Sequence, residues 1–152
     1  MKHTPAIEIA KHFIASFQKN ENAITNLKLQ KLLYYAQAWH LALYGTALFN
    51  DKIEAWVHGP VVPNVFREYK KYSWNPISVS PTNVLIHSSD IQFHLKQVIR
   101  VYGKFDATTL ERMTHRESPW MEARGTLAPD EPSNRVINLE SMKTFYRARL
   151  NG

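Results

Sequence analysis

The sequence predicts a mainly α-helical fold: a compact, single-domain bundle of about six or seven helices with at most one short pair of strands. Three observations lead to this fold class. Apolar residues recur at helical spacing along most of the chain. Residues that commonly cap or end helices separate these segments, and the alternation typical of strands is confined to residues 53–58. A chain of 152 residues can bury one hydrophobic core, so we expect a single domain over residues 1–152.

Two helices are expected in the first 45 residues. Thr4 followed by Pro5 is typical of a helix start, and apolar residues at helical spacing then predict a helix over residues 5–19. Thr25 or Asn26 caps a second helix, which ends at Gly45. This second helix is apolar around most of its circumference, so little of it can face water. We therefore expect it to run through the middle of the domain.

The middle of the chain predicts an extended segment, a rigid turn and a third helix. Residues 53–58 alternate between apolar and polar positions until Gly59 and Pro60 interrupt them. We expect residues 59–63 to form a turn that presents Trp56 and His58 in a defined geometry. Pro63 can begin a helix that continues to residue 72. Residues 73–89 predict a long loop, in which residues 84–86 could pair briefly as a strand.

Four more helices are expected in the second half of the chain. Residues that commonly cap or stop helices mark their boundaries: Ser89 or Asp90 and Gly103 for the first, Asp106 for the second, Ser118 with Pro119 and Gly125 for the third, and Asn138 for the last. Residues 126–135 predict a second loop.

The composition excludes several classes of function. Without cysteine, the chain has no disulfide, no thiolate nucleophile and no cysteine-ligated zinc. No apolar run approaches the ~18 residues of a membrane helix, and the N-terminus lacks the apolar stretch of a secretory signal. We expect a cytoplasmic protein with no membrane contact. The net charge of +6 would attract nucleic acid, but the basic residues are scattered and no groove-reading motif is found. Specific nucleic-acid binding is therefore not expected.

The histidines suggest metal or acid-base chemistry, but their spacing does not. None of the seven forms a metal-binding pattern, so we expect no metal, no cofactor and no catalytic residue. His115 and Glu117 could pair as a general base, although residues two apart on a helix face different directions. We favour a His115 that hydrogen-bonds the backbone of a buried turn. A small hydrolase using this His/Glu pair stays open as an alternative, as does a basic, phage-derived nucleic-acid-binding protein.

Two tryptophans stand beside caps or proline turns. Trp56 precedes the Gly59-Pro60 turn, and Trp120 follows Pro119. A large amphipathic ring in such a place either seals the core or forms the centre of a protein interface. Both roles stay open for these two residues.

An ordered set of motifs resembles the Panacea family, also known as SocA-like or phage-associated GepA-like proteins. The residues that carry the resemblance are Leu29 to Gln37 (Leu-Gln-Lys-Leu-Leu-Tyr-Tyr-Ala-Gln), Gly45, Leu48-Phe49, Ala55-Trp56, Gly59-Pro60-Val61, Tyr69, Gly103, Thr114-His115 and Pro119-Trp120. They appear in the order of the family pattern and cover roughly residues 25–124.

The resemblance implies a mostly helical, non-enzymatic antitoxin that binds and neutralises a cognate toxin protein, often encoded by an adjacent gene. Some family members act as adaptors that present the toxin to a protease, and others are known only as prophage proteins. The partner-binding or motif residues that it implies are Trp56, His58, Gly59, Pro60, Val61, Tyr69, His115 and Trp120. Some members carry an added DNA-binding segment, for which we see no room before Thr4 or after Leu150. Autoregulation is therefore not expected, and the helix after Asn138 matches no part of the pattern.

Overall fold

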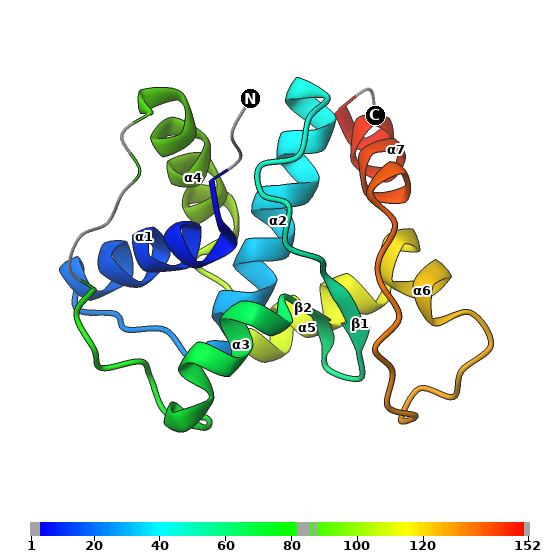
Figure 1. Cartoon of the computed structure of the whole chain (residues 1–152), viewed down its shortest axis with the longest axis horizontal. Coiled ribbons are helices and arrows are strands. Elements are labelled where there is room, and N and C mark those ends of the chain that lie inside the picture. The colour runs from blue at the N-terminus through cyan, green and yellow to red at the C-terminus, as the bar shows by residue number, and fades with distance from the viewer. Residues whose placement is uncertain (1–3, 82–85, 87, 151–152) are drawn as a thin grey trace.

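The structure, a computed structural model, describes residues 4–81, 86 and 88–150. Within these residues the chain forms seven α-helices and one two-stranded antiparallel sheet (Figure 1). The elements are α1 (Ala6–Lys19), α2 (Asn26–Tyr44), β1 (Glu54–Trp56), β2 (Gly59–Val61), α3 (Pro63–Tyr69) with a 3₁₀ turn over Lys70–Tyr72, α4 (Ser89–Tyr102), α5 (Ala107–His115), α6 (Ser118–Arg124) and α7 (Leu139–Leu150). The predicted fold class, a compact helical bundle with one short strand pair, is confirmed.

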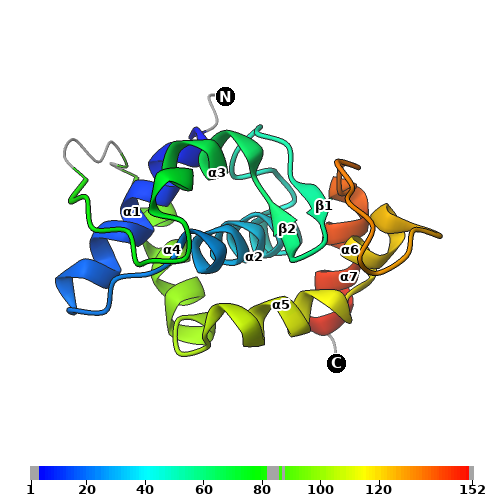
Figure 2. The ribbon, with the colours of Figure 1, turned by 90° about the horizontal axis from the view of Figure 1, so that it is seen from below.

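Helix α2 is the centre of the fold. It begins where the Thr25 hydroxyl accepts a hydrogen bond from the Lys28 N–H, and it ends at Gly45, whose φ of 77° lies in the left-handed region that favours glycine. All residues from 28 to 38 are buried, as the apolar circumference predicts. The other elements surround it (Figure 2), and α4 and α7 both pack against it.

Most helix boundaries agree with the predicted caps, and three helix starts differ by one residue. Helix α1 begins at Ala6, because the extended residue Pro5 occupies the N-cap position that was expected for Thr4. Asp106 and Asn138 cap α5 and α7 as expected. Helix α4 is capped by Ser88, whose hydroxyl accepts from the Ile91 N–H, and not by Ser89 or Asp90. Ser118 lies inside α6 rather than at its cap, because Glu117 occupies the N-cap position and its carboxylate is turned into the core.

The prediction of a turn at residues 59–63 is wrong. Gly59, Pro60 and Val61 form strand β2, which pairs with β1, and the hairpin turns at Val57 and His58. Proline fits this strand because Pro60 lies opposite Ala55, and the Ala55 N–H donates outside the hairpin, to the carbonyl of Arg135. The pair needs no ladder bond there, so the missing N–H of proline costs nothing.

Two further expectations concern the ends of the long loop and of the chain. The strand expected at residues 84–86 falls mainly outside the described residues, which include only residue 86 of the three. Helix α7, which had no counterpart in the family pattern, packs on α2 and α6. Its Tyr146 is completely buried, so this helix completes the core.

Candidate functional site

The β1–β2 hairpin is held at very short range against the central helix. Gly59 has a φ of +106°, and a Cβ atom at this position would lie 2.6 Å from Cε of Lys31 and 3.0 Å from Oγ1 of Thr114. Only glycine satisfies both the backbone angle and the space. The strand residues Gly59, Pro60 and Val61 are buried. They therefore position the hairpin and do not themselves offer a surface to a partner.

The outer side of the hairpin carries Trp56 and His58. Trp56 is half-buried, with its indole N–H donating to the Glu54 carboxylate at 2.9 Å and its ring edge-on to Phe66 at 5.0 Å. The His58 side chain is 65% exposed, and its Nδ1 lies 3.2 Å from the Glu111 carboxylate on α5. Both side chains are thus oriented by a carboxylate while keeping an accessible face.

These two residues line a surface cavity. It has a volume of about 500 Å³ and lies between the hairpin and the segment before α7, lined by Glu54, Trp56, Val57, His58, Pro132, Ser133 and Asn134. The cavity is open and its lining surface is mainly apolar, with one carboxylate and one imidazole in its wall. It suits a contact with a protein surface better than the enclosure of a small substrate.

The corner between α5 and α6 clamps the hairpin from behind. The Trp120 indole N–H donates to the Trp56 carbonyl at 2.9 Å, and the Arg124 guanidinium donates to the Ala55 carbonyl at 3.0 Å. The Trp120 ring stacks on His115, with ring centres 4.1 Å apart. Trp120 is therefore mainly a core residue that fixes the backbone of Trp56.

His115 lies inside this clamp. Burial lowers its pKa, while the Glu111 carboxylate and a backbone contact with Val57 act in the opposite direction. Its Nε2 is buried and has no hydrogen-bond partner among the described residues. The contact with Val57 is of the kind expected from the sequence, since Val57 belongs to the hairpin turn. A neutral, stacked imidazole of this sort serves packing.

Glu117 points away from His115 and into a cluster of tyrosines. Its carboxylate accepts hydrogen bonds from Tyr34 at 3.1 Å, from Tyr35 at 3.0 Å and from Tyr146 of α7. Burial raises the pKa of Glu117, and the three hydroxyl donors counteract this rise. The pair that a hydrolase would need is therefore not assembled. The cause is not the spacing along one helix, because α5 ends at His115 and Glu117 is the extended N-cap residue of α6.

The central helix contributes a buried amine at the same place. Lys31 is 1% exposed, and its Nζ donates to the Pro60 carbonyl at 3.2 Å. Burial lowers the pKa of Lys31 to about 7, although the Glu111 carboxylate favours the charged form. Lys31, Tyr34 and Tyr35 thus connect one face of α2 to the hairpin and to the α5–α6 corner.

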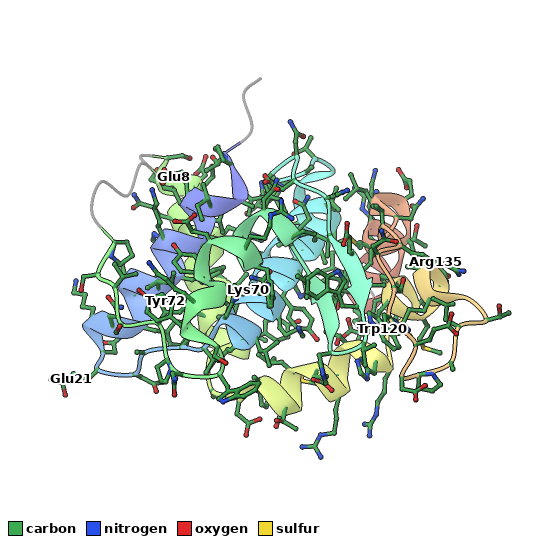
Figure 3. The ribbon with its side chains drawn as sticks, turned by 60° about the horizontal axis from the view of Figure 1, so that its bottom comes forward. Glu8, Glu21, Lys70, Tyr72, Trp120 and Arg135 are labelled. Carbon is green, nitrogen blue, oxygen red and sulfur yellow. The ribbon has the colours of Figure 1, made fainter. Side chains whose placement is uncertain are left out.

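Tyr69 does not join the other predicted site residues. It is buried on α3, and burial raises its pKa to about 12. It lines a different cavity, together with Lys11, Tyr72 and others. Figure 3 places Tyr72 and Trp120 on different sides of the molecule. The structure therefore brings seven of the eight predicted residues to the hairpin and its clamp, and leaves Tyr69 outside.

Sequence reasoning missed the buried polar groups that support the hairpin. Lys31 donates to the Pro60 carbonyl and Arg124 donates to the Ala55 carbonyl. Tyr146 is the third tyrosine that donates to Glu117. The sequence did indicate the role of Lys31, because this charged residue lies in the middle of a helix that has no polar side to face water. A charge in that position must find a buried partner.

Metal binding and membrane crossing find no support in the part of the chain that the structure describes. No three histidine, aspartate or glutamate side chains there are close enough together to hold a metal ion. None of the helices in these residues has both the length and the apolar character needed to cross a bilayer.

Comparison with known proteins supplies what the geometry alone does not. Residues 29–121 match the family described as antitoxin SocA-like, Panacea domain. The chain is also 34% identical, over 113 residues, to antitoxin SocA of Caulobacter vibrioides. This match covers 64% of the chain but only 58% of that relative, so the two proteins are alike over little more than half of the latter. No solved structure matches the chain.

Proposed function

We propose that this chain, which belongs to the family of SocA-like antitoxins with a Panacea domain, neutralises a cognate toxin protein by binding it directly. The toxin is expected to be encoded by an adjacent gene. We place this action in the cytoplasm of a bacterium or its prophage, with the whole described chain acting as one binding domain.

One observation supports a binding role above others. Seven of the eight site residues that the family resemblance implies lie at the hairpin or directly behind it, where Lys31, Trp120 and Arg124 hydrogen-bond the hairpin backbone. The polar groups of Lys31, Trp120 and Arg124 all donate to backbone carbonyls. The side chains of Trp56 and His58, in contrast, line the open cavity. An aromatic anchor held in one conformation binds a partner with little loss of conformational entropy. We propose that these two side chains contact the toxin.

Two modes of inhibition are compatible with such a contact. The antitoxin could block the toxin by covering its active surface, or it could act as an adaptor that presents the bound toxin to a protease. Measurement of the toxin's half-life in cells separates them: blocking leaves the half-life unchanged or longer, whereas delivery shortens it when the antitoxin is present.

The test is co-expression with the product of the adjacent gene. We expect growth to be rescued and a stoichiometric complex to be purified. Trp56→Ala should weaken the complex by about thirtyfold, as truncation of an interface anchor commonly does, and His58→Ala should weaken it less. Trp74→Ala is the matched control, because Trp74 is 82% exposed and lies outside the site.

The thermal transition must accompany these measurements, since Trp56 also packs on Phe66. If Trp56→Ala and His58→Ala both fold normally and bind the toxin as tightly as the wild type, the hairpin is scaffold only. If the wild-type protein itself forms no complex and rescues no growth, the antitoxin proposal fails. A stoichiometric metal ion, or a turnover abolished by His115→Ala in a folded protein, would instead favour the hydrolase.

A further inference from the structure

Both accessible rings of the hairpin have a carboxylate as hydrogen-bond partner. The Trp56 indole N–H donates to Glu54 at 2.9 Å, and Nδ1 of His58 lies 3.2 Å from a carboxylate oxygen of Glu111. An ionised carboxylate can only accept hydrogen bonds, so Nδ1 of His58 carries a proton at this contact. Nε2 of His58 has no hydrogen-bond partner in the described part of the chain. Negative charge therefore lies beside both rings.

The charged groups at the hairpin cavity are mainly negative. Glu54 and His58 are the ionisable side chains among the described residues that line it, and neither lysine nor arginine belongs to this lining. With Glu111 behind His58, two carboxylates face one imidazole, so the three groups are negative in sum whether or not the imidazole is protonated. Lys52 pairs with Glu54 at 3.4 Å, but its side chain is 63% exposed. Because an exposed ion pair of this kind is weak, a cation from a partner can compete with Lys52.

The Trp56 ring has no cation of its own chain over it. Lysine or arginine groups lie over several other aromatic rings, including the Arg124 guanidinium at 5.0 Å from the centre of the Trp120 ring. None lies over Trp56 among the described residues. Tryptophan is the aromatic side chain that attracts cations most strongly. The ring of Trp56 therefore adds to the attraction that the carboxylates exert on a positive group.

We infer that the hairpin cavity receives a basic side chain of the toxin, which lies against the Trp56 ring within reach of the Glu54 carboxylate. This inference rests on the proposed function and names the chemistry of the toxin group at that site. A guanidinium suits the site best, because it can stack on an indole and donate to a carboxylate at the same time. An acidic toxin group would instead meet the like charge of Glu54 and Glu111.

The test is the affinity of the adjacent gene's product for variants in which one carboxylate becomes an amide. Glu54→Gln keeps an oxygen that can accept the Trp56 N–H and removes the charge, and we expect it to weaken the complex by about tenfold or more. Glu111→Gln should weaken it by about threefold, because Glu111 acts through His58. Lys52→Met should tighten it by about twofold, since it removes the cation that competes for Glu54.

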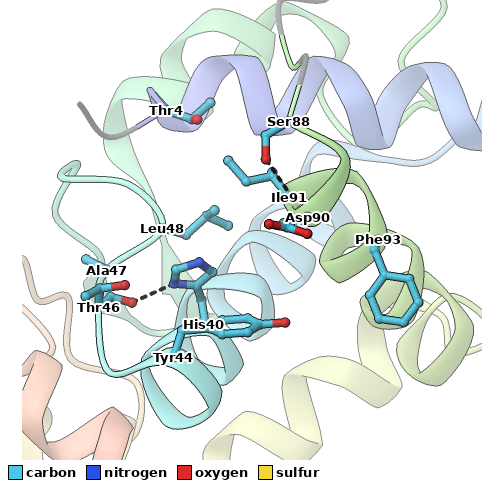
Figure 4. A pocket seen from close by; sticks show the side chains of 10 residues that line it. All are labelled: Thr4, His40, Tyr44, Thr46, Ala47, Leu48, Ser88, Asp90, Ile91 and Phe93. Atoms are coloured by element: carbon cyan, nitrogen blue, oxygen red, sulfur yellow. Dashed lines mark hydrogen bonds between the residues drawn. The ribbon is translucent and has the colours of Figure 1, made fainter. Parts of the chain in front are cut away.

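A second cavity of similar composition supplies the matched control. It lies where α2 ends and α4 begins, and its lining includes the imidazole of His40, the ring of Tyr44 and the carboxylate of Asp90 (Figure 4). Asp90→Asn removes the same charge from the chain as Glu54→Gln does, but at a place outside the hairpin. It should bind within about twofold of the wild type, because charges far from the contact are screened by salt.

A second readout identifies the toxin residue. Each arginine and lysine of the toxin is replaced with alanine and titrated against the wild type and against Glu54→Gln. The residue that enters the cavity should lose about tenfold in affinity against the wild type and little against Glu54→Gln. A change in Glu54 that merely disturbed the fold would reduce all the affinities alike. Thermal transitions of both amide variants accompany the titrations, and Glu111→Gln serves as the test if Glu54→Gln does not fold.

Other outcomes overturn the inference and leave the proposed function recognisable. If both amide variants bind like the wild type, or if Glu54→Gln binds more tightly, the cavity holds no basic side chain, while the antitoxin role stands. Equal losses for Glu54→Gln and Asp90→Asn would assign the effect to net charge and would overturn the inference too. An alanine scan in which every toxin residue is additive with Glu54→Gln would do the same. If the wild type forms no complex, the antitoxin role itself fails.

Discussion

At the scale of single residues, two buried ionisable groups define the centre of the molecule. Glu117 is surrounded by three tyrosine hydroxyls, whereas Lys31 has one carbonyl partner, on Pro60. Neither arrangement is the most stabilising choice, since an apolar residue of equal volume often stabilises a core more than a buried charge does. What these two groups contribute is the placement of the elements, because Lys31 joins the central helix to the hairpin and Glu117 joins it to the α5–α6 corner.

Substitution of Lys31 tests this view through pH. The lysine has a pKa of about 7 in the folded protein against 10.5 as its ordinary value, so the unfolded chain binds more protons between these pH values. The stability of the wild type should therefore rise as the pH rises from 7 toward 10. Lys31→Met should remove that rise and should be more stable at pH 7 by roughly 1 kcal/mol, after allowance for the Pro60 carbonyl that loses its partner.

Chemical denaturation at pH 7, 8 and 9 measures this effect. Lys19→Met, a change of an exposed lysine at the end of α1, is the control and should follow the wild type at each pH. Parallel pH profiles for Lys31→Met and the wild type would show that Lys31 is solvated and charged in the folded state.

At the scale of elements, the hairpin is the piece that the rest of the fold holds in place. Each strand is only three residues long, and an isolated hairpin of this size is not stable in water. It is held by three hydrogen bonds to two other parts of the chain. The Ala55 N–H donates to the Arg135 carbonyl in the segment before α7, and two side chains of α6 donate to the hairpin, Arg124 to the Ala55 carbonyl and Trp120 to the Trp56 carbonyl. The orientation of Trp56 is therefore a property of the whole fold.

Gly59→Ala should disturb this element more than a comparable glycine substitution elsewhere. A positive φ alone costs an alanine roughly 1–2 kcal/mol, and at Gly59 the new Cβ would also lie 2.6 Å from Lys31 Cε. Gly45 has a φ of +77°, but a Cβ atom there would lie 3.4 Å from the nearest atom, Nη2 of Arg147. We expect Gly59→Ala to lower the free energy of unfolding by about 1 kcal/mol more than Gly45→Ala does. Equal losses in denaturant titrations would mean that Lys31 moves aside freely.

At the scale of the whole molecule, the excess of positive charge is spread over many elements. Nineteen basic residues oppose thirteen acidic ones. Such a field speeds the approach of an acidic partner, but it specifies no sequence of bases. It favours association with an acidic protein over selective binding to nucleic acid.

Nucleic-acid binding should accordingly be weak, independent of sequence and sensitive to salt. We expect dissociation constants of about 10⁻⁴ to 10⁻⁶ M near physiological salt, the same within error for unrelated duplexes of equal length. Fluorescence anisotropy with two such duplexes at two salt concentrations measures this. Nanomolar affinity for one sequence would return the phage-derived nucleic-acid-binding protein as the better hypothesis.

The sequence by itself determined the helices and their order. The helical spacing of apolar residues and the capping residues are local properties of the sequence. The helix boundaries at Thr25, Gly45, Asp106 and Asn138 could therefore be identified from their neighbours alone. The burial of α2 was also predictable, because a helix without a polar face has only one place in a soluble fold. The family motifs then indicated which residues matter, although not what each of them contacts.

Tertiary structure decided what the sequence pattern could not. Residues 59–61 resemble a turn because glycine and proline commonly form turns, and they became a strand because Ala55 bonds Arg135 and not Pro60. The partners of Lys31 and Glu117 lie 29 and up to 83 residues away along the chain. No local spacing encodes such pairs, since they arise only when the hairpin, the α5–α6 corner and α7 pack around one helix. The same packing brings Leu43, Val101 and Leu150 together around one surface cavity.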